Sequence, residues 1–316
     1  MRSSYLLLLS ALFFLSTCQQ NTTGANKDVK AQKAALQQNT DKLSDYWYQG
    51  KAELNTYELK QNRYKDIHPG EVVAIFVTED FLTDKQVKND NYQNPNSIPI
   101  LKTNILRRFT TGIYDYSIMT SVFTPVEATK HPHTIKVSTS SQDWCGQSWM
   151  QLNMQKKEYQ MELRSYFENE GDKTRNAPLA LLEDEIMNRI RMNPAGLPVG
   201  NIQMIPSNHY LRLAHRSFGL VDANASLAEY EGEVFEGAHL MEYKIEIAAL
   251  NRILTFVFQT EPPYSIEGWT DTYPSAFDQQ KRTTTAIRKN TILEPYWQQN
   301  NPVNAARRSD IGLGGF

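Results

Sequence analysis

The sequence lacks the excess of one charge, the cysteine content and the long apolar runs that mark several common classes of protein. Its 316 residues contain 33 Lys and Arg against 35 Asp and Glu, which gives a formal net charge of −2 at pH 7. We therefore do not expect nucleic acid as a partner, because nucleic-acid-binding proteins usually carry a basic excess or a basic face. Two cysteines are too few for a disulfide-rich scaffold or a four-cysteine zinc site. The apolar runs are too short for a protein with several membrane spans.

The motifs of several large enzyme classes are also missing. The chain contains neither a P-loop nor the glycine fingerprint of dinucleotide-binding proteins. It has no Gly-x-Ser-x-Gly motif of a serine hydrolase and no His-Glu-x-x-His zinc motif. We therefore predict no cofactor and no metal ion.

The first 17 residues have the pattern of a secretory signal peptide. Met1 and Arg2 form a short positive region, and a nearly continuous apolar run follows from Tyr5 to Leu15. Eleven helical residues rise about 16 Å, which is about half of the hydrocarbon layer of a membrane. Residues 1–17 are therefore expected to direct export and to be removed.

Residues 15–18 read Leu-Ser-Thr-Cys and resemble the lipobox at which bacterial lipoprotein signals are cleaved. In such proteins the cysteine becomes the first residue and carries acyl chains, so Cys18 is the predicted lipid attachment site. Thr17 departs from the Gly, Ala or Ser that usually precedes this cysteine, and an ordinary secretory signal is the alternative. Several acyl chains together hold a protein stably on a membrane.

Residues 18–43 are rich in Gln, Asn, Thr, Lys and Ala and contain no aromatic residue. Such a stretch cannot bury enough surface to order itself, so it is predicted to be a flexible tether. Residues 44–316 are predicted to form a single globular domain. By resemblance to lipoproteins of the Bacteroidota, display on the cell surface would require an acidic cluster directly after the cysteine. Residues 19–22 contain no acidic residue. We therefore expect a bacterial outer-membrane lipoprotein that faces the periplasm.

From Tyr46 onward, apolar and polar residues alternate in short runs rich in aromatic and β-branched side chains, which predicts β-strands. The predicted strands are 52–64, 71–81, 134–140, 148–154, 159–167, 240–247, 253–259, 265–270 and 282–289. Turns at 155–157 and 248–251 are expected to join hairpins. The pattern indicates an α+β fold, rich in antiparallel β-sheet, with a curved sheet or half-barrel around one main helix.

The main helix is expected to start near Pro178, which suits a first helical turn. Apolar residues follow at positions 179, 182, 186 and 190, with the spacing of one helix face. Glu183–Glu185 are consecutive and would point in different directions around a helix. We therefore expect them to form a solvated face rather than a metal site.

The most unusual motif covers residues 142–149. Its Trp-Cys-Gly-Gln-Ser core is similar to the thioredoxin motif Trp-Cys-Gly-x-Cys, with serine in place of the second cysteine. A reactive thiol usually needs a helix directly after the cysteine, but residues 149–154 alternate like a strand. We therefore favour a free Cys145 packed beneath Trp144 and Trp149. Asp143, Trp144 and Trp149 could instead line a ligand site.

The histidines offer weaker candidates. His131 and His133 could hold a metal ion if a carboxylate or a third histidine approached them, but their surroundings read as a plain loop. His209 and His215 are weaker still. An enzyme centred on Cys145, or on Asp143 with His131 and His133, is kept as an alternative function.

Five motifs together resemble one known family. They are Ser44–Tyr48, Val77–Phe81, Thr111–Ser117, Ser140–Gly146 and Glu162–Phe167. They resemble a lipoprotein family of the Bacteroidota that commonly carries the label "septum formation inhibitor Maf", and the resemblance covers most of residues 44–300.

That label implies a nucleoside triphosphate pyrophosphatase. True Maf proteins resemble cytosolic enzymes with a Ser-x-Ser-Pro-Arg-Arg stretch near the N-terminus, which this chain does not contain. No Maf catalytic residue can therefore be placed. The favoured function is a membrane-anchored lipoprotein of the cell envelope that binds a lipid, a glycan or an envelope protein without catalysis. The pyrophosphatase activity is an alternative.

Overall fold

A computed structural model describes residues 42–313 of the chain. The predicted signal peptide (1–17) and the predicted lipid attachment site Cys18 lie outside the described residues, as does most of the tether. Leu43, the last residue of the predicted tether, is buried in the hydrophobic core. Within the described range, none of the helices combines the length and the apolar character needed to cross a membrane.

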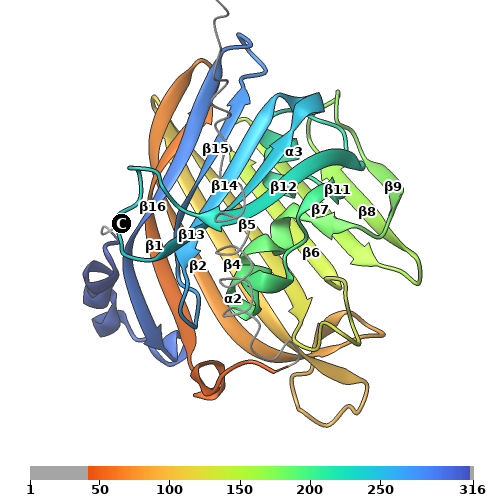
Figure 1. Cartoon of the computed structure of the whole chain (residues 1–316), viewed down its shortest axis with the longest axis vertical. Helices are drawn as coiled ribbons and strands as arrows, with labels where there is room; N and C mark the ends of the chain where they lie inside the picture. Colours follow the sequence, from red (N-terminus) through yellow and green to blue (C-terminus); the bar gives the residue numbers. More distant parts are fainter. Residues whose placement is uncertain (1–41, 314–316) are drawn as a thin grey trace, which may run out of the picture. The chain divides into compact units, whose positions relative to one another are not determined.

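Sixteen strands form one sheet (Figure 1). Their order along the sheet is β10-β11-β12-β13-β14-β15-β16-β1-β2-β4-β5-β6-β7-β8-β9, and β3 pairs with β2 off this path. Only β10 and β11 run parallel; the other neighbours are antiparallel. The bounds are β1 Ala52–Arg63, β2 Asp66–Leu82, β3 Val87–Lys88, β4 Ser97–Thr111, β5 Tyr114–Pro125, β6 Lys136–Asp143, β7 Gly146–Met154, β8 Glu158–Ser165, β9 Lys173–Pro178, β10 Leu181–Leu182, β11 Gly200–Ile205, β12 Val221–Glu229, β13 Leu240–Ile247, β14 Arg252–Gln259, β15 Ile266–Pro274 and β16 Lys281–Glu294.

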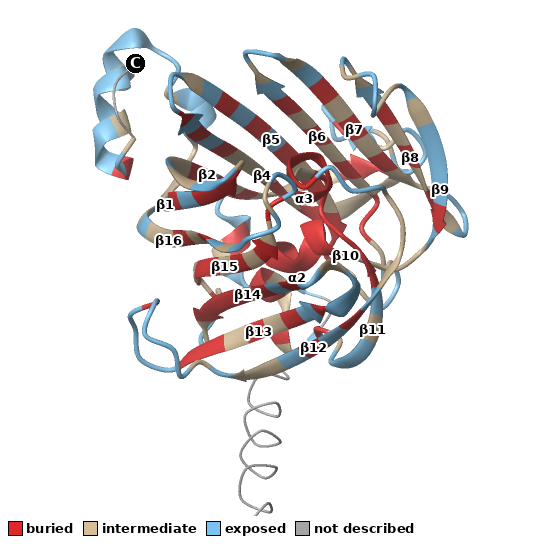
Figure 2. Ribbon diagram, turned by 90° about the horizontal axis from the view of Figure 1, so that it is seen from above, coloured by how far each residue is buried: buried red, intermediate tan, exposed pale blue. Residues whose placement is uncertain are grey.

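Two short α-helices lie on the concave side of the curved sheet, where buried residues gather (Figure 2). They are α2 (Ile186–Met192) and α3 (Asn208–Leu213). The 3-10 helices are η1 Asp45–Tyr48, η2 Glu183–Glu185, η3 Pro194–Gly196, η4 Ala248–Leu250, η5 Tyr296–Gln298 and η6 Pro302–Ile311. The sheet is therefore the framework of the fold, and α2 and α3 fill its interior.

The predicted sheet-rich, antiparallel fold is confirmed. All nine predicted strands are present, and both predicted hairpin turns connect neighbouring strands. Seven strands were not predicted, namely β3, β4, β5, β9, β10, β11 and β12. In β4 the inward positions include Thr103 and Arg107, which are both buried, so apolar and polar residues do not alternate along it. A polar interior thus hides a strand from a search for apolar periodicity.

The predicted single main helix is not confirmed. Lys173–Pro178 and Leu181–Leu182 form strands, and only Ile186–Met192 is α-helical in the predicted region. Glu183–Glu185 were expected to be solvated, but all three are buried. The expectation was wrong because neighbouring strands and loops supply buried partners for these carboxylates, which helical periodicity alone does not reveal.

A buried ion pair holds α2 against the sheet. The guanidinium of Arg191 on α2 meets the carboxylate of Glu53 on β1, with Nη2 and Oε2 2.6 Å apart, and neither side chain is exposed. The guanidinium also lies 4.9 Å from the ring centre of Trp47. Burial opposes ionisation of Glu53, but the charge and hydrogen bonds of Arg191 outweigh it and hold the pKa of Glu53 below its usual value.

Asn188 adds a second polar attachment of α2. Its amide nitrogen donates to the carbonyl oxygen of Leu101 and to Oγ1 of Thr124, both at 2.9 Å. Its amide oxygen accepts from the hydroxyl of Thr103. One side of α2 is thus bonded to β4 and β5 as well as to β1.

We predict that Arg191→Met lowers the free energy of unfolding by about 3–5 kcal/mol, because it leaves the Glu53 carboxylate buried without its partner. Lys289→Met is the matched control. Lys289 pairs with Glu58 at 2.7 Å, but both side chains are about half exposed, so we expect a change of about 1 kcal/mol or less. Urea unfolding followed by circular dichroism measures both. Equal losses for the two variants would contradict the role given to the buried pair.

Candidate functional site

Two cavities open on the concave side of the sheet, and α3 contributes side chains to both. The small cavity has a volume of about 40 Å³ and is lined by residues that include Arg107, Glu183, Asp184, His209 and Asp271. The large cavity has a volume of about 250 Å³. The small cavity holds on the order of three water molecules, whereas the large one has room for an organic ligand.

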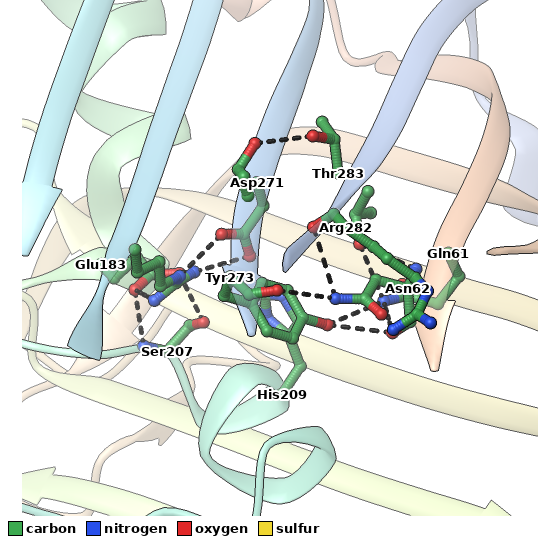
Figure 3. A network of polar contacts seen from close by, with 12 residues as sticks. Gln61, Asn62, Glu183, Ser207, His209, Asp271, Tyr273, Arg282 and Thr283 are labelled. Atoms are coloured by element: carbon green, nitrogen blue, oxygen red, sulfur yellow. Dashed lines mark hydrogen bonds and ion pairs between the residues drawn. The ribbon is translucent and has the colours of Figure 1, made fainter. Parts of the chain in front are cut away.

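The small cavity lies beside a buried network of charges (Figure 3). Arg252 at the start of β14 binds Glu183 through two contacts of 2.7 Å. It binds Asp271 of β15 through two further contacts, at 2.7 and 2.8 Å. The ring of Tyr210 lies 3.7 Å from the centre of the guanidinium. Arg252 is therefore fully satisfied and joins η2, two strands and α3.

The acidic residues of η2 also fix the start of α3. Glu183 accepts a hydrogen bond from the Ser207 hydroxyl at 2.6 Å and another from the Ser207 backbone N–H at 3.1 Å. Asp184 accepts from the backbone N–H of Asn208 at 3.1 Å. The carboxylates that sequence analysis placed in solvent thus determine where the side chains of α3 lie.

Asp184 is the carboxyl group that the cluster compensates least. Burial raises its pKa to about 7, and the neighbouring Glu183 adds to this effect. Arg107 donates to Gln61 at 2.7 Å, and burial lowers the pKa of its guanidinium. Burial, followed by the charges of Arg107 and Arg252, keeps the pKa of His209 well below its usual value. His209 is therefore neutral at pH 7.

The large cavity lies between α3 and the inner face of β6, β7, β8 and β9. Its apolar lining comprises Met150, Met161, Leu163, Leu211 and Phe218. Its polar lining comprises Thr139, Ser141, Ser148, Asn169, Glu170, Lys173, Arg175, Asn208, Arg212, His215, Arg216 and Ser217. The wall is therefore divided between an apolar part and a part rich in cations.

Several buried polar atoms in the lining of the large cavity have no partner. Within residues 42–313, neither amide atom of Asn208 accepts or donates a hydrogen bond, although this residue is only 1% exposed. The hydroxyl of Ser141 and Nε of Arg212 are likewise unsatisfied by the described part of the chain. Each such group costs about 1–3 kcal/mol if it stays unbonded. These groups are therefore candidates for polar contact with a ligand of the large cavity.

The cations of the large cavity differ in their partners. Arg212 binds Glu170 at 2.9 Å and lies 3.8 Å from Asp143. Lys173, Arg175 and Arg216 form no ion pair with a carboxylate of the described chain. His215 contacts Glu170 at 3.3 Å, so this carboxylate is engaged on two sides. Three unpaired cations therefore give the cavity a positive potential.

Asp143, Trp144 and Cys145 lie together at the turn between β6 and β7. Asp143 accepts a hydrogen bond from the backbone N–H of Cys145 at 2.6 Å and approaches the large cavity through Arg212. Cys145 is exposed, so its predicted packing beneath two tryptophans is wrong. The turn projects beyond the end of the sheet, and Trp144 is itself 71% exposed.

The other predicted site residues lie elsewhere. Trp149 alternates with Ser148 and Met150 along β7, and since these two line the large cavity, Trp149 faces the opposite side of the sheet. His131 and His133 lie in the connection before β6, at the far end of that strand from Asp143. Burial lowers the pKa of His133. Among residues 42–313, no group of three or more His, Cys, Asp or Glu side chains is placed to hold a metal ion.

Sequence analysis missed the residues that matter most for the large cavity, namely Asn208, Ser141 and Arg212. One signal was available, since Ser138–Ser141 are small hydroxyl residues within a predicted strand. In a strand with one buried face, an inward serine leaves space and a polar group. Asn208 and Arg212 carry no such signal, because α3 is too short for a helical pattern.

No family model and no curated protein matches the chain. Among solved structures, it is similar to a beta-barrel-like protein of domain of unknown function DUF1849 from Brucella abortus. The two are 8% identical, the match covers 77% of this chain and 97% of the other, and the TM-score is 0.46.

We predict that Asp184→Asn stabilises the protein at alkaline pH. A carboxyl whose pKa is raised to about 7 in the folded state keeps its proton where the unfolded chain loses it. Stability therefore falls as the pH rises from about 4 to about 7 and stays low above that range. The asparagine has no proton to lose and retains an oxygen that accepts from Asn208.

The difference in free energy of unfolding between Asp184→Asn and the wild type should therefore grow between pH 5 and pH 8.5, by up to about 2.7 kcal/mol. Urea unfolding at the two pH values measures it. Asp90→Asn, at an exposed position, is the control and should give a small, constant difference. A constant difference for Asp184→Asn as well would show that Asp184 is already ionised at pH 5.

Proposed function

We propose that the protein is a lipoprotein of the bacterial envelope that binds a small amphipathic anion in the large cavity. The observation that carries the proposal is the buried Asn208 amide, which belongs to the wall of the cavity and finds no partner for either polar atom within residues 42–313. A buried amide with a free donor and a free acceptor fits a ligand head group that offers both.

The division of the cavity wall supports an amphipathic ligand. Lys173, Arg175 and Arg216 favour a carboxylate or a phosphate, because they have no carboxylate partner in the described chain. The methionines and leucines of the opposite part favour an alkyl chain, since burial of apolar surface stabilises the complex. This combination favours a single-chain lipid over a glycan, which would need many more polar partners than the apolar part offers.

The membrane anchor of this function is Cys18, in a periplasm-facing outer-membrane lipoprotein. Its support is the lipobox-like Leu-Ser-Thr-Cys after an apolar segment of signal-peptide length. A tethered binding domain would meet lipids at the membrane to which it is attached. The resemblance to the Bacteroidota lipoprotein family also supports a location in the cell envelope.

An enzyme is the second candidate. The exposed thiol of Cys145 is the group that favours it, since an accessible thiol can react. The imidazoles of His131 and His133 lie at the other end of β6, so any activity of the thiol would depend on groups near the β6–β7 turn. Pyrophosphate release from nucleoside triphosphates is the test of the family label.

We predict that the purified protein binds laurate and dodecyl phosphate below their micelle concentrations but not dodecyltrimethylammonium, as measured by isothermal titration calorimetry. Asn208→Ala and the double variant Arg175→Glu, Arg216→Glu should each weaken laurate binding about tenfold or more. Arg175 and Arg216 are exposed, so their substitution by Glu leaves the fold intact.

Lys85→Glu is the matched control for this titration. It reverses one exposed charge in the turn after β2, away from the lining of the large cavity, and should leave laurate affinity unchanged. Equal binding of the cationic and anionic amphiphiles, or equal weakening by Lys85→Glu and the double variant, would contradict a cationic head-group site. Binding of a glycan in place of laurate would contradict an amphipathic anion as the ligand and would indicate a sugar.

We predict that radiolabelled palmitate is incorporated into the full chain expressed in a Bacteroidota host. Cys18→Ser should abolish the label, whereas Cys145→Ser should retain it, because only Cys18 follows the signal. Mass spectrometry of the N-terminal peptide identifies the acylated residue. An unmodified Cys18 in the mature protein would remove the anchor from the proposal without affecting the cavity.

A further inference from the structure

Seven connections between strands lie along one end of the sheet, and five of them follow β1, β4, β6, β8 and β15. The turns after β1, β4 and β6 close the pairs Arg63–Asp66, Thr111–Tyr114 and Asp143–Gly146. The loops after β8 and β15 leave the sheet at the same end, because Ser165 pairs with Ser148 near the β6–β7 turn and Lys60 pairs with Thr285 near the β1–β2 turn.

Large apolar side chains project from these connections. Ile113 is 85% exposed, Tyr166 73%, Trp144 71% and Phe277 47%. The first three are among the four most exposed large hydrophobic residues of the described chain. Such a concentration at one end is not expected of a surface that meets only water. We call these four residues, together with the half-buried Tyr64 and Tyr114, the aromatic rim.

Four rings of the aromatic rim, those of Phe277, Tyr64, Tyr114 and Trp144, lie next to one another in a row. Tyr64 contacts Phe277 with ring centres 4.8 Å apart, and Tyr114 lies 6.5 Å from both Tyr64 and Trp144. The hydroxyl of Tyr114 donates to that of Tyr64 at 2.6 Å. The tips of three hairpins and of the loop after β15 are thus linked through their side chains, so the apolar surface is fixed in shape.

The aromatic rim adjoins the opening of the large cavity. His215 lines that cavity, and its ring lies 6.2 Å from the ring of Phe277. Asn169 and Glu170, which also line the cavity, belong to the same loop as Tyr166. A surface that docks on the rim therefore lies beside the cavity.

Three carboxylates near the aromatic rim are paired within the protein. Asp278 pairs with Arg282 at 2.7 Å, and Glu170 pairs with Arg212 at 2.9 Å. Asp172 lies 4.0 Å from Arg164. The exposed cations nearby, Lys65, Arg175 and Arg216, stand apart from the rings. The rings themselves therefore need no charge of one sign in a partner, and a neutral surface of mixed polarity fits them.

We propose that the aromatic rim docks on the interfacial region of a neutral phospholipid membrane. Trp and Tyr are favoured at that depth because an apolar ring enters the acyl boundary while its polar atom stays among the head groups. The side chains of the aromatic rim come from several separate turns and loops, an arrangement that suits shallow insertion into a lipid bilayer. The large cavity would then open toward the lipid.

The chain length permits this docking for a protein anchored at Cys18. Cys18 and Lys42 are 24 residues apart in sequence, a length of chain that reaches at most about 80 Å. β1, which leads from the end near η1 to the aromatic rim, has 12 residues and spans about 40 Å. Only this step rests on the proposed function, since docking itself needs no acyl anchor.

The test uses the full chain with Cys18→Ser, in which Cys145 is the single thiol. An environment-sensitive fluorophore on Cys145 reports on the aromatic rim next to Trp144. With vesicles of phosphatidylcholine and phosphatidylethanolamine, we expect a blue shift that persists at high salt, and sedimentation of the protein with the vesicles. The double variant Trp144→Ser, Tyr166→Ser should weaken sedimentation about tenfold or more.

Tyr92→Ser is the matched control. Tyr92 is 67% exposed but lies in the connection between β3 and β4, at the other end of the sheet, so its loss should not change sedimentation. No blue shift, equal effects of the rim and control variants, or binding only to anionic vesicles at low salt would overturn the proposal. Laurate affinity separates the two proposals, because the rim variant should retain it and the Arg175→Glu, Arg216→Glu variant should lose it.

Discussion

The fold depends on the burial of a charged segment inside a curved sheet. Residues 183–191 carry carboxylates and guanidinium groups that would each be costly to bury alone. The interior supplies a partner for each of the main ones, with Arg252 for Glu183 and Glu53 for Arg191. These pairs attach the segment to β14 and to β1, which are separated by β15 and β16 in the sheet order. Apolar packing alone would leave the position of α2 much less specific.

The same carboxylates connect the core to the large cavity. Glu183 and Asp184 bond to the backbone of Ser207 and Asn208, and Asn208 belongs to the wall of the large cavity. The position of one side chain in that wall is thus set by an acidic cluster that lies outside the lining of the large cavity. A polar interior in this way orients part of the cavity wall.

Strands were predictable wherever apolar and polar residues alternate, as in β13, whose observed bounds coincide with those predicted. The prediction failed where the interior is polar. Helical spacing at 179, 182, 186 and 190 concealed the short strand β10, and Thr103 and Arg107 concealed β4. Asp143 and Trp144 were noticed because their motif is unusual, but the large cavity is formed by residues from distant segments. Pairing between β6 and β8, through β7, and the placement of α3 bring these together, and local sequence does not contain that information.

The two edges of the sheet belong to one short piece of chain. β9 ends at Pro178, and only Leu179 and Ala180 separate it from β10 at the opposite edge of the strand order. The two edge strands are therefore joined by covalent backbone and not by hydrogen bonds between strands. The distance between these edges can change without the loss of such a hydrogen bond. An open edge also invites strands of other molecules, and Lys173, Arg175 and Pro178 are residue types that discourage such pairing. Lys173 and Arg175, which line the large cavity, thus also place positive charge on an edge strand, where charge opposes pairing with another chain.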